Sequence, residues 1–169
     1  MDLELNGKVA FVTGSSKGIG LGIASKLAEE GCLVILNGRD AKTLAHACKQ
    51  IERSIGIPGD LSDEKICEQI IKKIKLEFGR LDILICNVGN GSLLNREEGS
   101  PEDWRVSLNS NLIPTTNTVW AAKDLLAKTK GVIVCISSIC GVEALGCPSA
   151  YAASKAALES FVRTSSRKL

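Results

Sequence analysis

The chain has 169 residues, of which 44% are hydrophobic and 24% charged, and its formal net charge is +2 at pH 7. This balance is ordinary for one globular domain with a sizeable core, and it argues against a disordered chain. Acids and bases are interspersed and form no basic stripe, so we expect neither nucleic acid nor an anionic membrane as a partner. No apolar run reaches the roughly 18 residues of a membrane span, and the acidic N-terminus lacks an apolar core, so we expect a cytoplasmic protein.

Five short apolar runs, bounded by Gly, Asn or Pro, predict strands over residues 8–13, 32–37, 54–58, 81–87 and 131–137. Helical spacing between and after them predicts helices over residues 19–30, 41–52, 63–78, 101–129 and 149–168. Asp40 and Ser100, the latter followed by Pro101, are start signals for two of these helices. Strand alternating with helix indicates an α/β fold: a doubly wound parallel sheet with helices on both faces, in a single domain over residues 1–169.

The segment "TGSSKGIG", residues 13–20, joins the first strand to the first helix. Gly14 allows a tight turn, Gly18 lets the backbone approach a ligand, and Gly20 permits close contact of the helix. The following helix offers N–H groups and a positive dipole end, so the turn is expected to hold a pyrophosphate. Its spacing is GxxxGxG rather than GxGxxG, and alone it also fits a turn without a ligand.

A second motif, "YAASK", places Tyr151 and Lys155 four residues apart, on one face of a predicted helix. An adjacent ammonium favours the phenolate form of tyrosine, which makes the side chain usable for proton transfer. Small or polar residues also follow every predicted strand. Because ligands bind at the carboxyl ends of parallel strands, these segments are expected to share one site.

These motifs together resemble the short-chain dehydrogenase/reductase family, over essentially the whole chain and especially its 3-oxoacyl-carrier-protein-reductase-like and glucose-dehydrogenase-like members. The resemblance is carried by residues 13–20, 59–63, 87–89, Asn111, 136–138 and 151–155. It implies a Rossmann-type fold and hydride transfer between a nicotinamide cofactor and a small carbonyl or alcohol substrate.

The resemblance also implies individual roles. Tyr151 is then the general acid/base, Lys155 activates it and holds the nicotinamide ribose, Ser138 hydrogen-bonds the carbonyl, and Asn111 binds a water that links Lys155 to solvent. Ser137 is the competitor of Ser138, but strand parity and the spacing to Tyr151 favour Ser138. Two donors aimed at one oxygen suit the negative charge that hydride transfer builds there.

Charge near the end of the second strand bears on the cofactor. Arg39 and Lys17 favour the 2′-phosphate of NADP(H) over NAD(H), because an acid would repel a phosphate and a guanidinium binds it. Asp40 is interpreted as the N-cap of the next helix, and Asp60 resembles the family residue that contacts the adenine edge. The expected cofactor-binding residues are Gly14, Ser16, Lys17, Gly18, Ile19, Gly20, Arg39, Asp60, Leu61, Asn87, Gly89, Tyr151 and Lys155.

Two features depart from the family pattern. The loop after the fourth strand reads Cys86-Asn87-Val88-Gly89 where NNAG is usual, and Val88 is expected to weaken cofactor binding or displace the loop. Family members usually continue beyond the YxxxK helix with further strands and a substrate lid. We therefore expect a C-terminally truncated chain whose fifth strand has an unpaired apolar edge. A non-catalytic dinucleotide-binding or scaffold fragment remains the alternative function.

The seven cysteines form no CxxC pair and most lie in apolar stretches, so we expect reduced core cysteines rather than disulfides or a zinc site. His46 is alone on a surface helix, and no metal site is expected. The helices over 101–129 and 149–168 resemble the family's subunit contacts, which implies a homodimer or homotetramer. Residues 90–94 and 139–145 are expected to line the substrate pocket.

Overall fold

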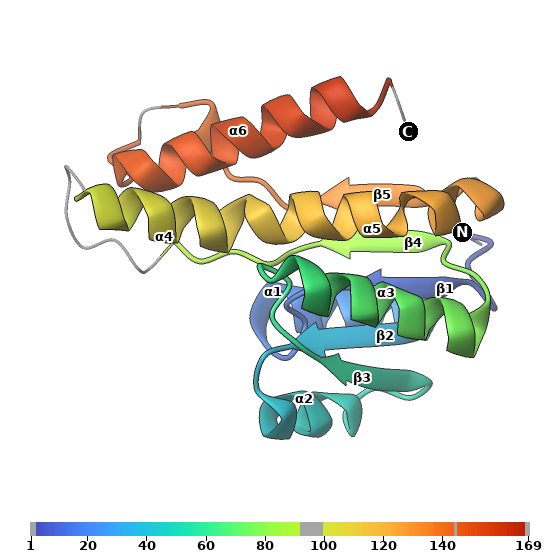
Figure 1. Ribbon diagram of the computed structural model, residues 1–169. Helices are drawn as coiled ribbons and strands as arrows, with labels where there is room; N and C mark the ends of the chain where they lie inside the picture. The colour runs from blue at the N-terminus through green and yellow to red at the C-terminus, as the bar shows by residue number, and fades with distance from the viewer. Residues whose placement is uncertain (1–2, 92–99, 144, 168–169) are drawn as a thin grey trace.

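A computed structural model describes residues 3–91, 100–143 and 145–167 of the chain. Five parallel strands form one sheet in the order β3-β2-β1-β4-β5 (Figure 1). The strands are β1 (Val9–Val12), β2 (Leu33–Gly38), β3 (Ser54–Pro58), β4 (Ile83–Cys86) and β5 (Val132–Cys135). Each lies within or overlaps one of the five apolar runs, so the predicted parallel α/β sheet is confirmed.

In the described part of the chain, six α-helices and one 3₁₀ turn, η1, connect and follow the strands. They are α1 (Gly18–Glu29), α2 (Ala41–Cys48), α3 (Glu64–Phe78), α4 (Pro101–Asn111), α5 (Ile113–Thr129), η1 (Ile139–Gly141) and α6 (Ser149–Ser165). The start signals act as expected: Asp40 accepts a hydrogen bond from Thr43 N, and Ser100 forms a capping box with Asp103 ahead of Pro101.

The single helix predicted over residues 101–129 is wrong, because the structure divides it into α4 and α5 at Leu112. Pro114, in the first turn of α5, has no N–H with which to continue the hydrogen-bond ladder of α4. The division leaves Asn111 as the last residue of α4, buried and at the carboxyl edge of the sheet.

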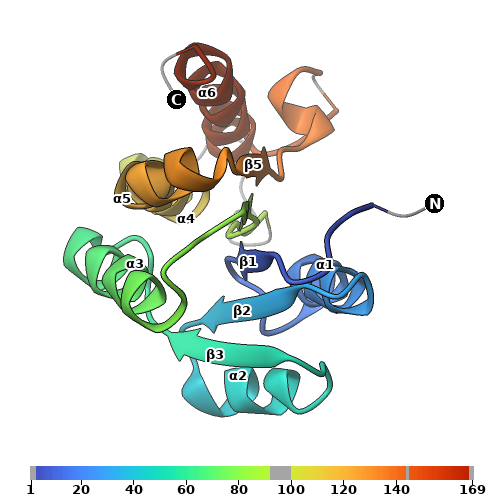
Figure 2. The same cartoon turned by 90° about the vertical axis from the view of Figure 1, so that its right-hand side faces the viewer.

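Alternate residues of the strands face two separate apolar cores. Phe11 and Ile35 pack with residues of α3 and α5, whereas Val12 and Leu36 pack with residues of α1 and α2. Figure 2 shows this layering, with α3 and α5 on one side of the sheet and α1 on the other. Both faces are therefore covered by helices, as the doubly wound arrangement requires.

Strand β5 lies at the edge of the sheet and is only partly covered. Within the described residues it pairs with β4 alone. Val132 and Val134 are 57% and 42% exposed, while Ile133 packs against the core on the opposite face. A cavity of about 490 Å³ adjoins the strand between α5 and α6. Among the described residues, β5 therefore forms the expected apolar edge without a second pairing partner.

The expectation that all cysteines are reduced is wrong for one pair. Cys140 in η1 and Cys147 before α6 form a disulfide, with their Cα atoms 6.2 Å apart. The disulfide joins two cysteines that lie seven residues apart and that no short motif marks. The other cysteines are free, as expected: Cys32, Cys48, Cys67, Cys86 and Cys135.

Among the described residues, membrane-spanning helices and metal-binding clusters of side chains are both absent. None of the helices there combines the length and the apolar character that crossing a bilayer requires. The same residues contain no group of three or more His, Cys, Asp or Glu side chains able to hold a metal ion. His46 lies exposed on α2.

Candidate functional site

The glycine-rich turn connects β1 to α1 at the carboxyl edge of the sheet, where strand order reverses between β1 and β4. Gly14 and Gly18 both have φ of +59°, a backbone conformation that favours glycine. A Cβ atom at Gly18 would meet nothing within 4 Å, so this side of the turn is open. Lys17, the N-cap of α1, makes no side-chain hydrogen bond to the first turn. The turn thus presents a helix N-terminus, which attracts anions.

Gly20 is required for space rather than for conformation. A Cβ atom there would lie 2.6 Å from the Gly14 carbonyl oxygen and 3.0 Å from Ser15 Cα. The Asn87 side-chain amide donates to the carbonyls of Thr13 and Gly14, at 3.1 and 3.0 Å. The turn, the first helical residues and the loop after β4 are therefore packed directly against one another.

Two buried hydroxyl side chains, which the sequence analysis missed, fix the turn in place. Thr13 Oγ1 accepts from Asn87 N at 2.9 Å. Ser15 Oγ donates to the Val12 carbonyl at 2.6 Å and accepts from Asn37 N at 3.0 Å. The signal available in the sequence was a small hydroxyl residue directly after a buried strand, a position from which a side chain can bond to neighbouring strand ends.

Charged side chains flank the turn beyond β2. Arg39 is 81% exposed, with Nη1 3.9 Å from Asp60 Oδ2, and Lys17 is exposed. Asp40 accepts hydrogen bonds from Thr43 Oγ1 and N, at 2.6 and 2.7 Å, and these bonds hold the pKa of its carboxyl below the usual value. Asp40 is thus engaged as a helix cap, and Arg39 and Lys17 are exposed cations at this end of the site.

The other expected cofactor residues differ in exposure, so a ligand would contact the side chain of some and only the main chain of others. Ile19 is 69% exposed beside the turn, and Ser16 is half-buried. Leu61 is buried in the core, so a ligand near it would meet its main chain rather than its side chain. The main chain there is fixed, because Asn117 Nδ2 donates to the Leu61 carbonyl at 3.0 Å.

The Tyr151–Lys155 pair lies on α6, next to the end of β5. Lys155 is 4% exposed, and its Nζ donates to the Ile136 carbonyl at 2.9 Å and lies 6.0 Å from the centroid of the Tyr151 ring. Burial lowers the pKa of Lys155, against a smaller raising effect of Cys135. A cation held beside the phenol stabilises negative charge on its oxygen.

Asn111 and the loop after β4 complete this end of the site. Asn111 is fully buried; its Oδ1 accepts from Asn90 N at 2.8 Å, and its Nδ2 donates to the Asn90 and Ser107 carbonyls. A Cβ atom at Gly89 would lie 3.0 Å from Asn111 Oδ1 and 3.2 Å from Lys155 Nζ. Glycine at position 89 therefore lets the loop lie directly against both side chains.

Gly91 brings the same loop to the tyrosine. A Cβ atom there would lie 3.4 Å from Tyr151 Cζ and 3.7 Å from its hydroxyl oxygen. Tyr151, Lys155 and Asn111 are thus gathered around residues 89–91. Val88 packs against the core, and one of its methyl carbons would lie 3.2 Å from a Cβ atom at Gly14. The expected effect of Val88 on cofactor binding stays a prediction.

The two adjacent serines after β5 have different partners. Ser137 Oγ donates to Glu159 Oε1 on α6 at 2.9 Å, whereas Ser138 Oγ accepts from Cys140 N at 3.3 Å as the N-cap of η1. Ser138 thus retains its hydroxyl proton for a further acceptor. The assignment of Ser138 as the carbonyl-binding serine stays a prediction.

The expected substrate segments lie partly outside the described residues, namely at 92–94 and 144. Among the described ones, Ile139, Val142 and Leu145 are all more than half exposed. They are apolar and follow β5 on the same segment as Ser138. The glycine-rich turn and the Tyr–Lys pair therefore lie along one edge of the sheet.

Comparison with known proteins gives concordant results. The family model described as short chain dehydrogenase matches residues 8–169. An uncharacterised oxidoreductase of Staphylococcus saprophyticus is 35% identical over 99% of this chain and 74% of its own. Hydroxynaphthalene reductase of Aspergillus fumigatus is 36% identical over 95% of this chain and 60% of its own.

Among solved structures, L-sorbose reductase of Gluconobacter frateurii, complexed with NADPH and L-sorbose, superposes with a TM-score of 0.89 at 30% identity. That match covers 99% of this chain and 66% of the reductase. The alcohol dehydrogenase of Thermococcus sibiricus, complexed with 5-hydroxy-NADP, has the same TM-score at 29% identity, over 95% of this chain and 71% of its own. The chain thus spans between three fifths and three quarters of the length of these proteins. It belongs to the short-chain dehydrogenase family.

Proposed function

We propose that the chain carries the catalytic machinery of an NADP(H)-dependent oxidoreductase that interconverts a small carbonyl compound and a secondary alcohol. One observation supports this most strongly: Asn111, Tyr151 and Lys155 converge on residues 89–91, beside the glycine-rich turn. These residues come from distant parts of the sequence, and each is positioned by its own hydrogen bonds or by burial.

The proposed division of labour follows from their chemistry. The nicotinamide, when bound, supplies or accepts the hydride. Tyr151 gives a proton to the carbonyl oxygen in reduction or removes one from the alcohol in oxidation, and Ser138 donates a second hydrogen bond to that oxygen. Lys155, charged and buried, stabilises the phenolate left on Tyr151, while Asn111 holds the loop that carries Gly89 against Lys155.

The preference for NADP(H) is supported by charge. Arg39 and Lys17 are exposed cations beside the turn, and Asp40 is engaged as a helix cap. Two related structures hold NADPH or an NADP derivative. An exposed guanidinium next to a phosphate-binding turn suits a 2′-phosphate, which a carboxylate would repel.

The proposal also covers the oligomeric state of the protein and its place in the cell. Trp104 and Trp120 are 37% and 48% exposed on α4 and α5. Exposed tryptophans on adjacent helices support a contact between subunits, so we propose a homodimer or homotetramer in the cytoplasm.

The decisive experiment measures turnover and cofactor binding in the same variants. Tyr151→Phe should lower kcat by about 100-fold or more, because it removes the proton donor, while NADPH affinity measured by nicotinamide fluorescence stays within about twofold. Ser138→Ala should also lose turnover, whereas the matched control Ser137→Ala, which loses only its bond to Glu159, should retain it. Undiminished turnover in Tyr151→Phe would contradict the proposal.

A second candidate, a non-catalytic dinucleotide-binding or scaffold fragment, is favoured by the exposed Val132 and Val134 on β5. The same assays separate the two. A scaffold would bind NADPH and show no nicotinamide oxidation with any carbonyl compound, in the wild type as in Tyr151→Phe.

A further inference from the structure

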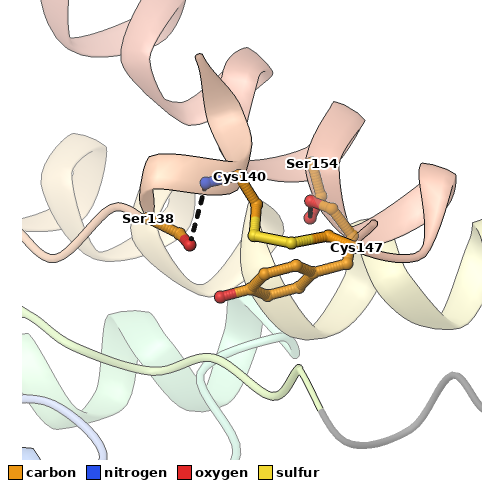
Figure 3. The surroundings of a disulfide bond; sticks show 5 residues. Ser138, Cys140, Cys147 and Ser154 are labelled. Carbon is orange, nitrogen blue, oxygen red and sulfur yellow. Dashed lines mark hydrogen bonds between the residues drawn. A yellow bond between two sulfur atoms is a disulfide. The ribbon is translucent and has the colours of Figure 1, made fainter. Parts of the chain in front are cut away.

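The Cys140–Cys147 disulfide closes the segment that joins the two halves of the candidate site. Figure 3 shows it between η1, which follows Ser138, and the residues that lead into α6. Cys147 lies two residues before the first residue of α6 and four before Tyr151. One covalent bond therefore links the segments that carry Ser138 and Tyr151.

The Cys140 side of the disulfide lies beside two site residues. The main-chain N–H of Cys140 donates to Ser138 Oγ at 3.3 Å, the dashed line in Figure 3. On the other side of η1, a Cβ atom at Gly141 would lie 3.0 Å from the carbonyl carbon of Lys155. Movement of η1 therefore changes both the hydroxyl orientation of Ser138 and the packing beside Lys155.

Besides the disulfide, the residues between η1 and α6 have few constraints, whereas the first turn of α6 is held by Ser107 Oγ, which donates to the carbonyl of the buried Ala150 at 3.0 Å. The N-cap residue of α6 is Pro148, which makes no side-chain cap hydrogen bond. The residues around the intervening segment are exposed, with Val142 at 68% and Leu145 at 55%. Opening the bond removes the one covalent constraint on a segment that has few buried contacts of its own.

The two sulfurs are also placed where reagents reach them. Cys140 and Cys147 are only half-buried, and the surrounding loop is exposed. Cys86 and Cys135, by contrast, are register partners on β4 and β5, and Cys86 is buried in the core. The Cα separation of 6.2 Å lies within the range in which a disulfide forms without backbone movement.

We propose that Cys140 and Cys147 form a thiol–disulfide switch that controls the position of Ser138 and Tyr151, an inference that rests on the proposed function. With the bond closed, the segment is ordered and the site is competent. With the bond open, the segment gains conformational freedom and the rate of the chemical step falls.

The chemistry balances with a low-molecular-weight disulfide, such as oxidised glutathione, as the oxidant. The thiolate of one cysteine attacks a sulfur of the small disulfide, forming a mixed disulfide and releasing one small thiolate. The thiolate of the second cysteine then attacks the protein sulfur of that mixed disulfide and expels the second small thiolate. The two protein thiol protons pass to the released thiolates, so two protein sulfurs are oxidised and two small-molecule sulfurs are reduced. Excess small thiol reverses both steps.

The test equilibrates the full chain with mixtures of reduced and oxidised glutathione, and follows three readouts. Alkylation and mass mapping of the tryptic peptide 131–155, which contains Cys135, Cys140 and Cys147, reports the bond state. Hydrogen exchange of residues 138–151 reports their order. Nicotinamide oxidation under saturating NADPH reports kcat.

We expect reduction to leave all three cysteines of the peptide open to alkylation, to speed hydrogen exchange in residues 138–151, and to lower kcat about tenfold or more. Cys147→Ser should show the reduced behaviour at every glutathione ratio. Cys48→Ser, which removes a half-buried free cysteine on α2, should respond as the wild type does.

Two results would overturn the switch. In the first, all three cysteines of peptide 131–155 are alkylated at every glutathione ratio, so the disulfide does not form. In the second, the bond opens and closes with no change in hydrogen exchange or kcat. Faster exchange on reduction, in a chain that shows no turnover in either state, would support the switch while contradicting the proposed enzyme.

Discussion

Arg39 follows β2 with an exposed guanidinium that forms a long ion pair, at 3.9 Å, with the half-exposed Asp60 carboxylate. Such a surface pair contributes little to stability, so the guanidinium is available to a phosphate. Arg39→Ala should weaken NADPH binding by about 10- to 100-fold, the effect of losing one or two charge-assisted hydrogen bonds, and leave NADH binding within about twofold. Nicotinamide fluorescence titration measures both affinities.

A matched control for Arg39 is Lys49→Ala, which removes an exposed cation at the far end of α2. It changes the net charge equally, so any effect of net charge alone should lower NADPH affinity by the same factor in both variants. Equal losses of NADPH affinity in the two variants, or equal losses for NADPH and NADH in Arg39→Ala, would argue against a 2′-phosphate contact.

Asp82 is a buried carboxylate far from the site that ties the beginning of β4 to β1. It accepts from Val9 N at 2.9 Å and from Arg80 Nη2 at 2.6 Å, and Lys8 lies 4.0 Å away. Burial alone would raise the pKa of Asp82, but the hydrogen bonds from Arg80 and Val9, with the charges of Arg80 and Lys8, outweigh it and hold the pKa below 3.8.

The sign of the pH effect follows from this lowered pKa. In the unfolded chain Asp82 takes up a proton near pH 3.8, and in the folded chain only at lower pH. Its contribution to stability is therefore complete above the unfolded value and is lost as the pH falls through the folded value. Asp82→Asn should lower the free energy of unfolding by about 1–2 kcal/mol at neutral pH and flatten its decline in acid.

Urea unfolding at neutral pH and at about pH 3 checks this prediction, with Asp124→Asn, an exposed carboxylate on α5, as the control. The control should follow the wild-type pH profile. The same acid slope in Asp82→Asn as in the wild type would exclude Asp82 as a source of acid sensitivity.

At the scale of elements, α1 offers a direct test of the glycine-rich turn. Gly20 and Gly22 lie two residues apart in the same helix, yet a Cβ at Gly20 would collide with the Gly14 carbonyl, while one at Gly22 meets nothing within 4 Å. Gly22→Ala should therefore raise the free energy of unfolding by about 0.5–1 kcal/mol, through reduced backbone entropy of the unfolded chain. Gly20→Ala should lower it by about 1–3 kcal/mol.

The two substitutions should also differ in their effect on cofactor binding. Gly20→Ala should weaken NADPH binding, because the turn has to shift away from β4, and Gly22→Ala should leave it unchanged. Urea unfolding and fluorescence titration measure the two effects. If both variants changed stability and affinity in the same direction, the packing of Gly20 against Gly14 would not be what positions the turn.

Buried parallel strands are the elements that the sequence predicts best. Runs such as Val9–Val12 are apolar on both faces, so their composition alone marks them. The division between α4 and α5 escaped prediction because helical spacing continues through Leu112, and η1 is too short to show a period. The Cys140–Cys147 bond escaped because it depends on how a loop turns in space.

The same contrast holds for the candidate site. The glycines and the Tyr151–Lys155 pair are visible as motifs, since each lies within a few adjacent residues. The hydrogen bonds of Thr13 and Asn37 link strand ends about 20 to 75 residues apart, and no local pattern records them. Motifs in the sequence therefore mark the expected ligand residues, whereas the hydrogen bonds that hold these residues in place become visible only in the structure.

At the scale of the whole molecule, the parallel sheet brings the ends of β1, β4 and β5 to one edge, so segments near residues 14, 87 and 138 become neighbours. The same arrangement leaves β5 at the border of the sheet, with Val132 and Val134 exposed. Unpaired, apolar edge strands promote association between chains. The exposed border of β5 and the edge that carries the candidate site are thus two consequences of one strand order.

The last prediction concerns that border. Val132→Lys should increase the fraction of the 169-residue chain that stays monomeric in sedimentation velocity, because a charged edge position disfavours strand pairing between molecules. Its free energy of unfolding should change by no more than about 0.5 kcal/mol, since Val132 is 57% exposed. Leu76→Lys is the matched control: Leu76 is 76% exposed, but on α3, where no backbone edge is open. An equal gain of monomer in both variants would mean that general charge, and not the edge of β5, governs association.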